Sequence, residues 1–566
     1  MLDMFWVAVF TATLFVPIFC LLSARWFLFK RPRTAAGTRI IGFFHPVSVF
    51  CCCCLRVGRG QSYINIESNN QPSSNLTSFF LLVSVSFSSF SSFSPLHLLH
   101  PLHASPTPSY EQFANSGGGG ERVLWCAIKA LEEMHLDPSS SHSFHVIVYT
   151  GDNDATPAAI LKRCKDRFGV EFEGTKMTVE FQYLQKRAWV RAEGYSRFTL
   201  LGQSFGSMVL GWEALRLAVP DVFIDSTGYA FTMPLARLLG GCTVIAYTHY
   251  PTISTDMLNM VFSRRPSYNN ASAVSNSRVA SGFKYIYYWM YALLYRIAGQ
   301  FAHLVMVNST WTYGHIAGLW GQTSTHIVYP PCDVERMAGF PLDDQGRNER
   351  KLFLSIGQFR PEKDHALQLR AVRALVDQYE SLSERNRDVL SQVRLYLIGS
   401  CRDDGDRERV QVLEALSKEL KVEKYVQFQL NAPFPDLCRW LGEATAGLHT
   451  MWNEHFGIGV VEMQTAGCIP IAHNSAGPRK DIVIHHQGVA TGLLAETPEE
   501  YAEAMAYVLN LDVGNGNSRV SQGWSKWGDE EQWTTQEMRT AGRASSRRFS
   551  ETCFKETVKV HLKSFV

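Results

Sequence analysis

The chain has 566 residues, of which 19% are charged and 46% are hydrophobic, and its formal net charge is +2. This length predicts two or three domains with well-filled cores. The near-neutral charge excludes a strongly basic nucleic-acid binder and an acidic solvating tail. The thirteen cysteines contain no paired CxxC motifs, so we expect reduced thiols rather than a zinc site or a disulfide framework.

An uncharged apolar run occupies residues 4–22, and four basic residues follow it between positions 25 and 33. Its length is close to the roughly 20 residues that a helix needs to cross a bilayer. By the positive-inside rule the rest of the chain would stay in the cytosol. A cleaved signal peptide is the alternative, but its basic residues would precede the apolar run. We therefore predict a single-pass membrane anchor over residues 1–34.

Residues 38–46 are typical of a short buried strand that runs into a loop. The composition then changes, because residues 47–113 are rich in Ser, Phe, His and Pro and contain almost no acidic residue. This stretch shows no sustained period, which predicts a disordered, low-complexity insert.

After residue 113, short apolar runs alternate with helical patterns. The expected strands are FHVIVYTG, TVEFQYL, DVFIDS, CTVIAYTH, LVMVNS, HIVYPP, KLFLSIGQ, RLYLIGS, AGLHTMW and CIPIAHN. Such alternation predicts parallel sheets in α/β layers, and the number of strands fits two Rossmann-like domains. Paired prolines near residues 329–333 mark the break. The predicted domains are 35–46 with 114–327, then 328–535, then a C-terminal helix at 536–566.

Residues 283–297 are predicted to form one helix with an apolar stripe. The stripe consists of Phe283, Ile286, Tyr287, Met290, Leu293, Leu294 and Ile297. Further aromatic residues surround it, so two interpretations stay open. The helix either belongs to a core or lies on a membrane surface.

The segment from Glu454 to Glu462 contains two carboxylates with seven residues between them, two of which are Gly457 and Gly459. These glycines indicate a loop that enters a helix after a strand. Amides at a helix start favour an anionic ligand, and a carboxylate accepts hydrogen bonds from sugar or ribose hydroxyls. Solvated surface acids are the alternative interpretation.

Two further segments are suited to phosphate groups. A predicted strand ends at Gly357 and is followed by Arg360 and Lys363, a planar fork and a point charge that fit a diphosphate. Four glycines, 117–120, precede a helix and would let a ligand approach the backbone closely. No Lys-Ser/Thr pair follows them, which excludes a P-loop. A surface charge pair and a flexible linker are the respective alternatives.

His249 stands at the end of a predicted strand, where ligands bind in open α/β sheets, and could donate to a phosphate or to the acceptor. A purely structural histidine is the alternative. Two D-x-D segments, 152–154 and 404–406, could hold a metal, but both lie in contexts typical of turns. We therefore expect no metal site.

Taken together, these motifs resemble the retaining GT-B glycosyltransferases of family four. The similarity is closest to the α-1,2-mannosyltransferases that extend the dolichol-linked oligosaccharide on the cytosolic face of the endoplasmic reticulum. The stretches that carry the resemblance are GFFHP (42–46), NSGGGGERVLWCAIKAL (115–131), LLGQSFGSMVLGWEAL (200–215), PDVFIDSTGYAFTMPL (220–235), THYPTISTDML (248–258), NNASAVSNS (269–277), VNSTWT (307–312), VYPPCDV (328–334), SIGQFRPEKDHALQLRA (355–371), HTMWNEHFGIGVVE (449–462) and AHNSAGPRKDIV (472–483).

The resemblance implies an α/β GT-B fold with two domains facing a cleft, and transfer of mannose from GDP-mannose without a cofactor. The implied acceptors are Man3GlcNAc2 and Man4GlcNAc2 on dolichol diphosphate, for protein N-glycosylation. The implied partners are the endoplasmic reticulum membrane and other mannosyltransferases of the pathway.

The resemblance also implies a set of site residues. His249 and Glu454 would lie at the reacting sugar. The residues implied to bind the donor are Gly118, Gly119, Arg360, Lys363, Phe456, Gly457, Ile458, Glu462, Asn474 and Ser475. Within this set, Arg360 and Lys363 would hold the diphosphate and Glu462 the ribose.

The insert departs from the family pattern. In the family the His-Pro of GFFHP runs almost directly into the glycine loop, whereas here residues 47–113 separate them at a loop that borders the cleft. The insert resembles translated non-coding sequence, such as a retained intron. If it belongs to the protein, an inactive GT-B scaffold that only binds pathway partners is the alternative function. A soluble glycogen- or sucrose-type synthase fits less well, because of the apolar N-terminal run and the 248–258 segment.

Overall fold

The computed structural model describes ten stretches of the chain. They are residues 38–44, 119–136, 143–172, 177–195, 198–257, 278–321, 324–342, 344–401, 404–512 and 533–565. The predicted anchor, the predicted insert and Gly118 lie outside these described residues. Within the described stretches, no helix combines the length and the apolar character that a bilayer crossing requires.

The described part of the first lobe contains a parallel sheet of seven strands in the order β3-β2-β1-β4-β5-β6-β7. The strands are β1 (Thr38–Phe44), β2 (Ser143–Thr150), β3 (Thr178–Tyr183), β4 (Val222–Asp225), β5 (Thr243–Thr248), β6 (Leu304–Val307) and β7 (Thr325–Ile327). The strand order reverses between β1 and β4, and sheets of this kind receive ligands beyond the strand ends at such a point.

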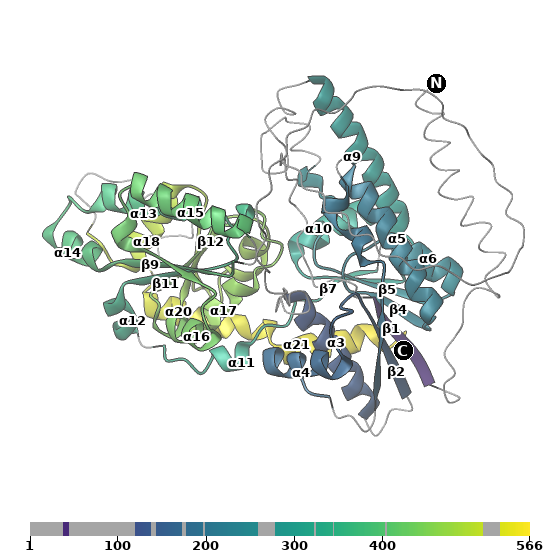
Figure 1. Cartoon of the computed structure of the whole chain (residues 1–566). Helices are drawn as coiled ribbons and strands as arrows, with labels where there is room; N and C mark the ends of the chain where they lie inside the picture. The colour runs from purple at the N-terminus through teal and green to yellow at the C-terminus, as the bar shows by residue number, and fades with distance from the viewer. Residues whose placement is uncertain are drawn as a thin grey trace, which may run out of the picture. The chain divides into compact units, whose positions relative to one another are not determined.

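Two helical layers cover this sheet (Figure 1). One layer consists of α3 (Gly119–Leu136), α4 (Pro157–Phe168) and α21 (Glu551–Leu562). The other consists of α5 (Thr199–Leu217), α6 (Thr232–Leu235), α9 (Arg278–Gly299) and α10 (Thr310–Trp320). Each layer buries its own apolar cluster against the sheet, around Ile128 on one face and around Leu210 on the other. The central strands are consequently buried on both sides.

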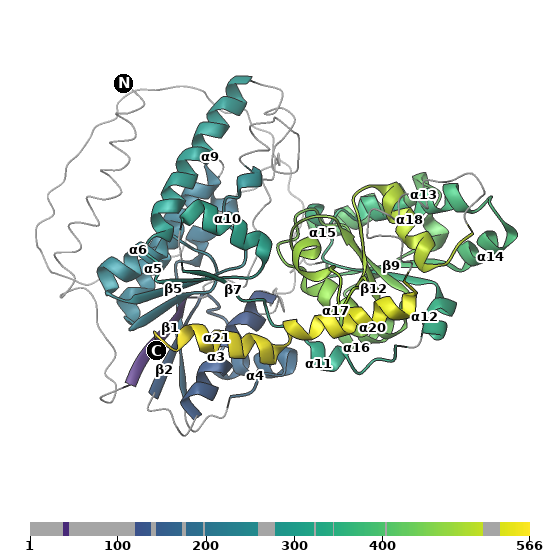
Figure 2. The same cartoon turned by 180° about the vertical axis from the view of Figure 1, so that it is seen from behind.

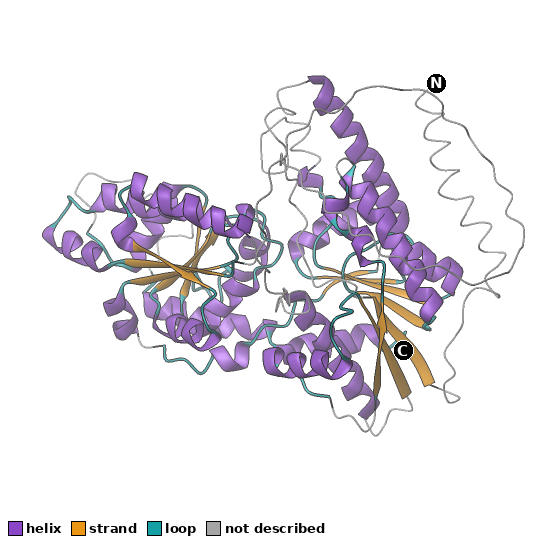
Figure 3. Cartoon of the chain, in the orientation of Figure 1, coloured by secondary structure: helices purple, strands orange, loops and turns teal. Residues whose placement is uncertain are grey.

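The described part of the second lobe contains six parallel strands in the order β10-β9-β8-β11-β12-β13. They are β8 (Leu352–Ile356), β9 (Arg394–Gly399), β10 (Val426–Leu430), β11 (Ala446–His449), β12 (Ile469–His473) and β13 (Leu493–Ala495). One face is covered by α13 (His365–Tyr379), α14 (Glu384–Gln392), α15 (Asp404–Glu419) and α18 (Pro498–Val508). The other carries α11 (Val334–Met337), α12 (Asp344–Arg350), α16 (Phe434–Glu443) and α17 (Ile458–Ala466), with α20 (Thr535–Ser546) beside α17 (Figure 3).

The alternation of strands and helices predicted from the sequence is confirmed, and the predicted break lies between β7 and α11. Two strands were missed. In β10, Gln427 and Gln429 interrupt the apolar pattern because this strand is at the edge of its sheet. The strand β13 has three residues, which is too short for a periodic signal.

The helix predicted at 283–297 is part of α9, but its predicted stripe is not the buried face. Ile286 and Leu293 of the stripe are exposed, whereas Tyr291 and Tyr295 are buried. The tyrosines can face inward because their hydroxyls find partners. The Tyr291 hydroxyl lies 2.9 Å from Ser204 Oγ, for example. The core interpretation of the helix is therefore confirmed through its tyrosines, whereas the stripe is only partly buried, with Tyr287 and Leu294 packed against the core.

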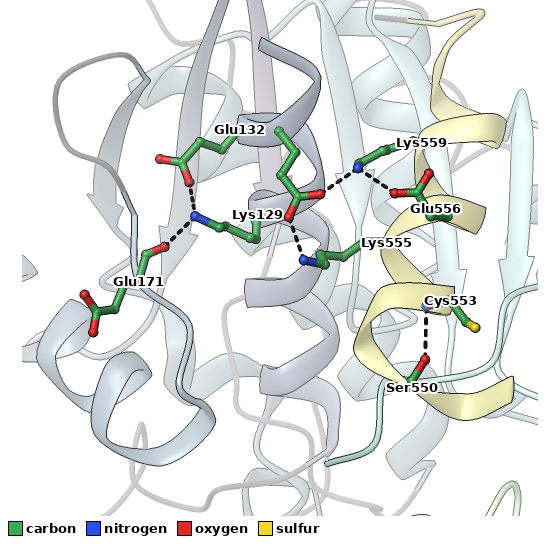
Figure 4. A network of polar contacts seen from close by, with 9 residues as sticks. Lys129, Glu132, Glu171, Ser550, Cys553, Lys555, Glu556 and Lys559 are labelled. Carbon is green, nitrogen blue, oxygen red and sulfur yellow. Dashed lines mark hydrogen bonds and ion pairs between the residues drawn. The ribbon is translucent and has the colours of Figure 1, made fainter. Parts of the chain in front are cut away.

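The last helix of the chain returns to the first lobe. After α20, α21 packs along α3 (Figure 2). Lys555 and Lys559 of α21 point toward that helix (Figure 4). The Glu133 carboxylate of α3 lies 2.6 Å from each lysine ammonium. Phe554 is buried with the α3 residues of the first lobe's core. The C-terminal helix thus completes the lobe that the N-terminal half of the chain begins.

We expect Phe554→Ala to lower the free energy of unfolding of the first lobe by about 3 kcal/mol, because it removes a buried aromatic ring. Val560→Ala is the matched control, since Val560 lies on the same helix and is 72% exposed. Thermal unfolding followed by circular dichroism measures both. Equal midpoints for the two variants would show that α21 does not stabilise the lobe.

Candidate active site

The candidate site lies at the carboxyl ends of three neighbouring strands of the second lobe. In the sheet, β8 pairs with β11, and β11 pairs with β12. The loops that follow these strands therefore lie side by side. They contain most of the donor-binding residues that the resemblance implies for this lobe.

The structure brings Lys363 and Glu454 into direct contact. Lys363 ends the short helix η4 (Pro361–Lys363) in the loop after β8, and Glu454 belongs to the loop after β11. Lys363 Nζ donates to Glu454 Oε2 over 2.7 Å and lies 3.1 Å from Met451 Sδ. Two residues that are 91 positions apart thus form one charged pair.

The Glu454 carboxylate is ionised at neutral pH. Burial alone would raise its pKa, but the Lys363 ammonium and the His449 ring together hold the pKa of Glu454 well below its usual range. His449 Nε2 lies 3.2 Å from the same oxygen, Oε2, that accepts from Lys363. The site therefore contains a negative charge directly beside a positive one.

Two glycines shape the loop that carries Glu454. Gly457 caps α17 with a φ of +111°, a conformation that side chains disfavour. The Gly477 amide donates to the Glu454 carbonyl over 2.9 Å. A Cβ at Gly477 would collide with the backbone of Phe456, so the loops after β11 and β12 are packed backbone to backbone. This packing holds Phe456, Gly457 and Ile458 at the amide end of α17, which favours an anion.

Asn474 and Ser475 have different surroundings. Ser475 Oγ accepts a hydrogen bond from the backbone N–H of Asn453, the residue before Glu454, over 2.8 Å. It also lies 3.0 Å from His473 Nδ1. Asn474 Nδ2 donates to Glu496 Oε1 over 2.9 Å. Ser475 therefore supports the Glu454 loop, whereas the Asn474 side chain is engaged with Glu496.

Arg360 and Glu462 do not join the Lys363–Glu454 pair in the described contacts. Arg360 Nη1 lies 4.0 Å from Glu362 Oε1 in the same loop as Lys363. Glu462 lies on α17, and burial raises its pKa to about 7, an effect that Arg122 of α3 partly offsets. The two glutamates of the motif thus have opposite electrostatic surroundings.

The first lobe contributes Gly119 and His249. A Cβ at Gly119 would collide with Ile458 Cδ1, so the start of α3 contacts the start of α17. His249 is buried just after β5, and its Nε2 lies 3.1 Å from the Ser226 carbonyl, to which it donates. Burial lowers the pKa of His249 to about 4, so the ring is neutral at pH 7.

Sequence patterns missed a group of residues around His455. Its ring stacks on Tyr250 and on Trp311, with centroid distances of 5.1 and 5.2 Å. Beside it, Asn453 Nδ2 donates to Asp256 Oδ2 over 3.1 Å. Tyr250 and Asp256 lie in the 248–258 segment that carries the resemblance, and this was the available signal.

The two D-x-D segments are engaged in ion pairs. Asp152 Oδ1 lies 2.8 Å from Arg187 Nη1, and Asp404 Oδ1 lies 2.6 Å from Arg407 Nη1. Across the described residues, no group of three or more His, Cys, Asp or Glu side chains has a geometry that could hold a metal ion.

We expect Glu462→Gln to change the pH dependence of stability. A carboxyl with a raised pKa stabilises the fold fully below its unfolded pKa, and this contribution is lost as pH rises through about 7. The free energy of unfolding of the variant, relative to that of wild type, should therefore be about 1–2 kcal/mol higher at pH 8 than at pH 5. Urea unfolding at both pH values measures this gain. Glu499→Gln, at an exposed position of α18, is the control. The same difference at both pH values would contradict the assignment.

Two family models match the chain. Residues 108–320 match the model described as ALG11 mannosyltransferase N-terminus, and residues 343–523 match the model described as Glycosyl transferases group 1. The second match and the two parallel sheets confirm the predicted GT-B-like fold.

Curated relatives cover both lobes. A Xenopus laevis protein is 49% identical over 403 residues, which are 71% of this chain and 79% of that protein. A human protein is 45% identical over 449 residues, 79% of this chain and 84% of its own length. A Dictyostelium discoideum protein is 46% identical over 403 residues, 71% of this chain and 77% of its own length. All three bear one name, and the chain therefore belongs to their family, the GDP-Man:Man(3)GlcNAc(2)-PP-Dol alpha-1,2-mannosyltransferases.

Proposed function

We propose that the chain transfers mannose from GDP-mannose, in α-1,2 linkage and with retention, to dolichol-diphosphate-linked Man3GlcNAc2 and Man4GlcNAc2. Family membership supports the reaction class. The observation that carries the site is the Lys363–Glu454 pair at the amide end of α17. This arrangement combines a cation for a diphosphate with a carboxylate for sugar hydroxyls.

Each group has a role in breaking the bond to the leaving nucleotide. GDP gains negative charge as the anomeric bond breaks, and Lys363, Arg360 and the α17 amides are suited to stabilise that charge. Glu454 remains ionised and accepts hydrogen bonds from the transferred mannose. The acceptor hydroxyl then attacks the same face through an oxocarbenium-like state. None of these roles needs a divalent ion.

We expect wild-type enzyme to transfer mannose to a synthetic lipid-linked trimannosyl acceptor in the presence of EDTA. Lys363→Ala and Glu454→Gln should each reduce the rate by about 100-fold or more, because each removes charge stabilisation or orientation at the reacting sugar. Lys480→Ala, at an exposed position of the second lobe, is the matched control. UDP-glucose and ADP-glucose in place of GDP-mannose test the donor, and the chain without 47–113 tests the insert. Full activity of both site variants would defeat the assignment.

We also propose that the enzyme acts at the cytosolic face of the endoplasmic reticulum membrane, where other mannosyltransferases of the pathway would be its partners. The apolar run at residues 4–22 would be a single-pass anchor. The exposed side of α9 supports a second contact with the bilayer. We call it the aromatic face, and its residues are Tyr285, Ile286, Trp289, Leu293 and Ile297.

The composition of α9 favours a lipid surface over water. The helix contains Lys284 and Arg296 and no carboxylate. Tyrosine, tryptophan and basic residues are typical of helices that lie at a membrane interface. Exposed Phe198, at the start of α5, lies beside α9, with its ring 5.3 Å from that of Tyr287.

We expect the double variant Ile286→Glu/Trp289→Glu to slow transfer to a long-chain acceptor in vesicles by about tenfold, because two charges oppose burial at the bilayer interface. Transfer to a short-chain, water-soluble acceptor should be unchanged. Val560→Glu, at an exposed apolar position of α21, controls for added charge. A similar loss with both acceptors would show that the face does not contact lipid.

A further inference from the structure

His449 is the last residue of β11, and its side chain is buried. Its Nε2 lies 3.2 Å from Glu454 Oε2. An ionised carboxylate can only accept a hydrogen bond, so the ring proton that faces it is on Nε2. Nδ1 is also buried and has no hydrogen-bond partner among the described residues. Within the described part of the chain, the ring therefore makes its one polar contact with Glu454.

The backbone of His449 is held independently of the loop that it faces. The hydroxyl of Tyr501, a buried residue of α18, donates to the His449 carbonyl over 2.9 Å. The next residue, Thr450, donates through Oγ1 to the Lys363 carbonyl over 2.8 Å and accepts from Gln368 Nε2 over 2.8 Å. The end of β11 is thus a rigid support for both Lys363 and Glu454.

The shared oxygen of Glu454 creates a problem when a donor binds. In the proposed donor complex Lys363 Nζ turns toward the diphosphate oxygens, which weakens its pairing with the carboxylate, and a buried carboxylate that loses its ion pair is strongly destabilised. A second donor on the same oxygen compensates this loss, because hydrogen bonds to charged groups are among the strongest in proteins. His449 Nε2 is placed to be that donor.

We propose that His449 is a positioning residue that keeps the Glu454 carboxylate ionised and in place against the transferred sugar while Lys363 moves to the donor diphosphate. The inference rests on the proposed roles of Glu454 and Lys363 in donor binding. It assigns to His449 no contact with substrate. It also explains why a histidine ends a strand whose other residues, Ala446, Gly447 and Leu448, are small or apolar.

Steady-state kinetics of the full chain test the proposal. His449→Leu should lower kcat for mannose transfer by about 20-fold and change the KM for GDP-mannose by less than about threefold, because orientation of the sugar matters most in the transition state. His449→Gln should recover kcat to within about threefold, because its amide can donate in place of Nε2–H. His145→Leu is the control, since His145 Nε2 contacts Glu180 Oε2 in the sheet of the first lobe. Unchanged kcat in His449→Leu, no recovery in His449→Gln, or a loss confined to KM would overturn the proposal.

A second measurement does not depend on mannose transfer. We expect His449→Leu to lower the thermal unfolding midpoint more than twice as much in the wild type as in a Glu454→Gln background. The reason is that the effects of substitutions at two contacting residues are not additive. Equal shifts in both backgrounds would overturn the inference. If the shifts are unequal but the protein transfers no mannose from GDP-mannose, the proposed function is refuted. The conclusion that His449 supports Glu454 would then still hold.

Discussion

A buried, ionised carboxylate is the constraint on which the second lobe's site depends. Glu454 stays charged because Lys363 and His449 meet it at one oxygen. Lys363 belongs to the loop after β8, His449 ends β11, and Glu454 belongs to the loop after β11. In a parallel sheet, neighbouring strands end at the same edge, so the chain needs no special path to bring them together. The fold brings the three side chains together, and the burial of the carboxylate strengthens the electrostatic interaction between them.

Close backbone packing makes this coupling precise. The loop after β12 approaches the Glu454 loop so closely that Gly477 has no room for a Cβ, and its amide binds the Glu454 carbonyl. Ser475 binds the neighbouring Asn453 amide. These contacts fix the backbone on both sides of the carboxylate.

Local sequence patterns were sufficient to predict the buried strands and the loop that enters α17. Apolar runs predicted the central strands, and the glycines around Glu454 predicted the start of α17. The contact of His449 with Glu454 was not predicted, because a histidine at the end of a strand does not by itself indicate which side chain it faces. The burial of the tyrosines of α9 was also not predicted. Their hydroxyls can face a core only because they form hydrogen bonds with distant residues such as Ser204. The return of α21 to the first lobe depends on Glu133, more than 400 residues earlier, which no local pattern reports.

The opposite electrostatics of Glu454 and Glu462 suit a site that must attract an anion. Both carboxylates are buried near α17, and if both were fully ionised their charges would repel a diphosphate. Glu462, whose pKa is about 7, carries only part of a negative charge at neutral pH, and Arg122 lies close enough to offset it. The full charge of Glu454 is matched by Lys363. The helix start between them therefore retains its positive character, and the motif can contain two acids without becoming an acidic site.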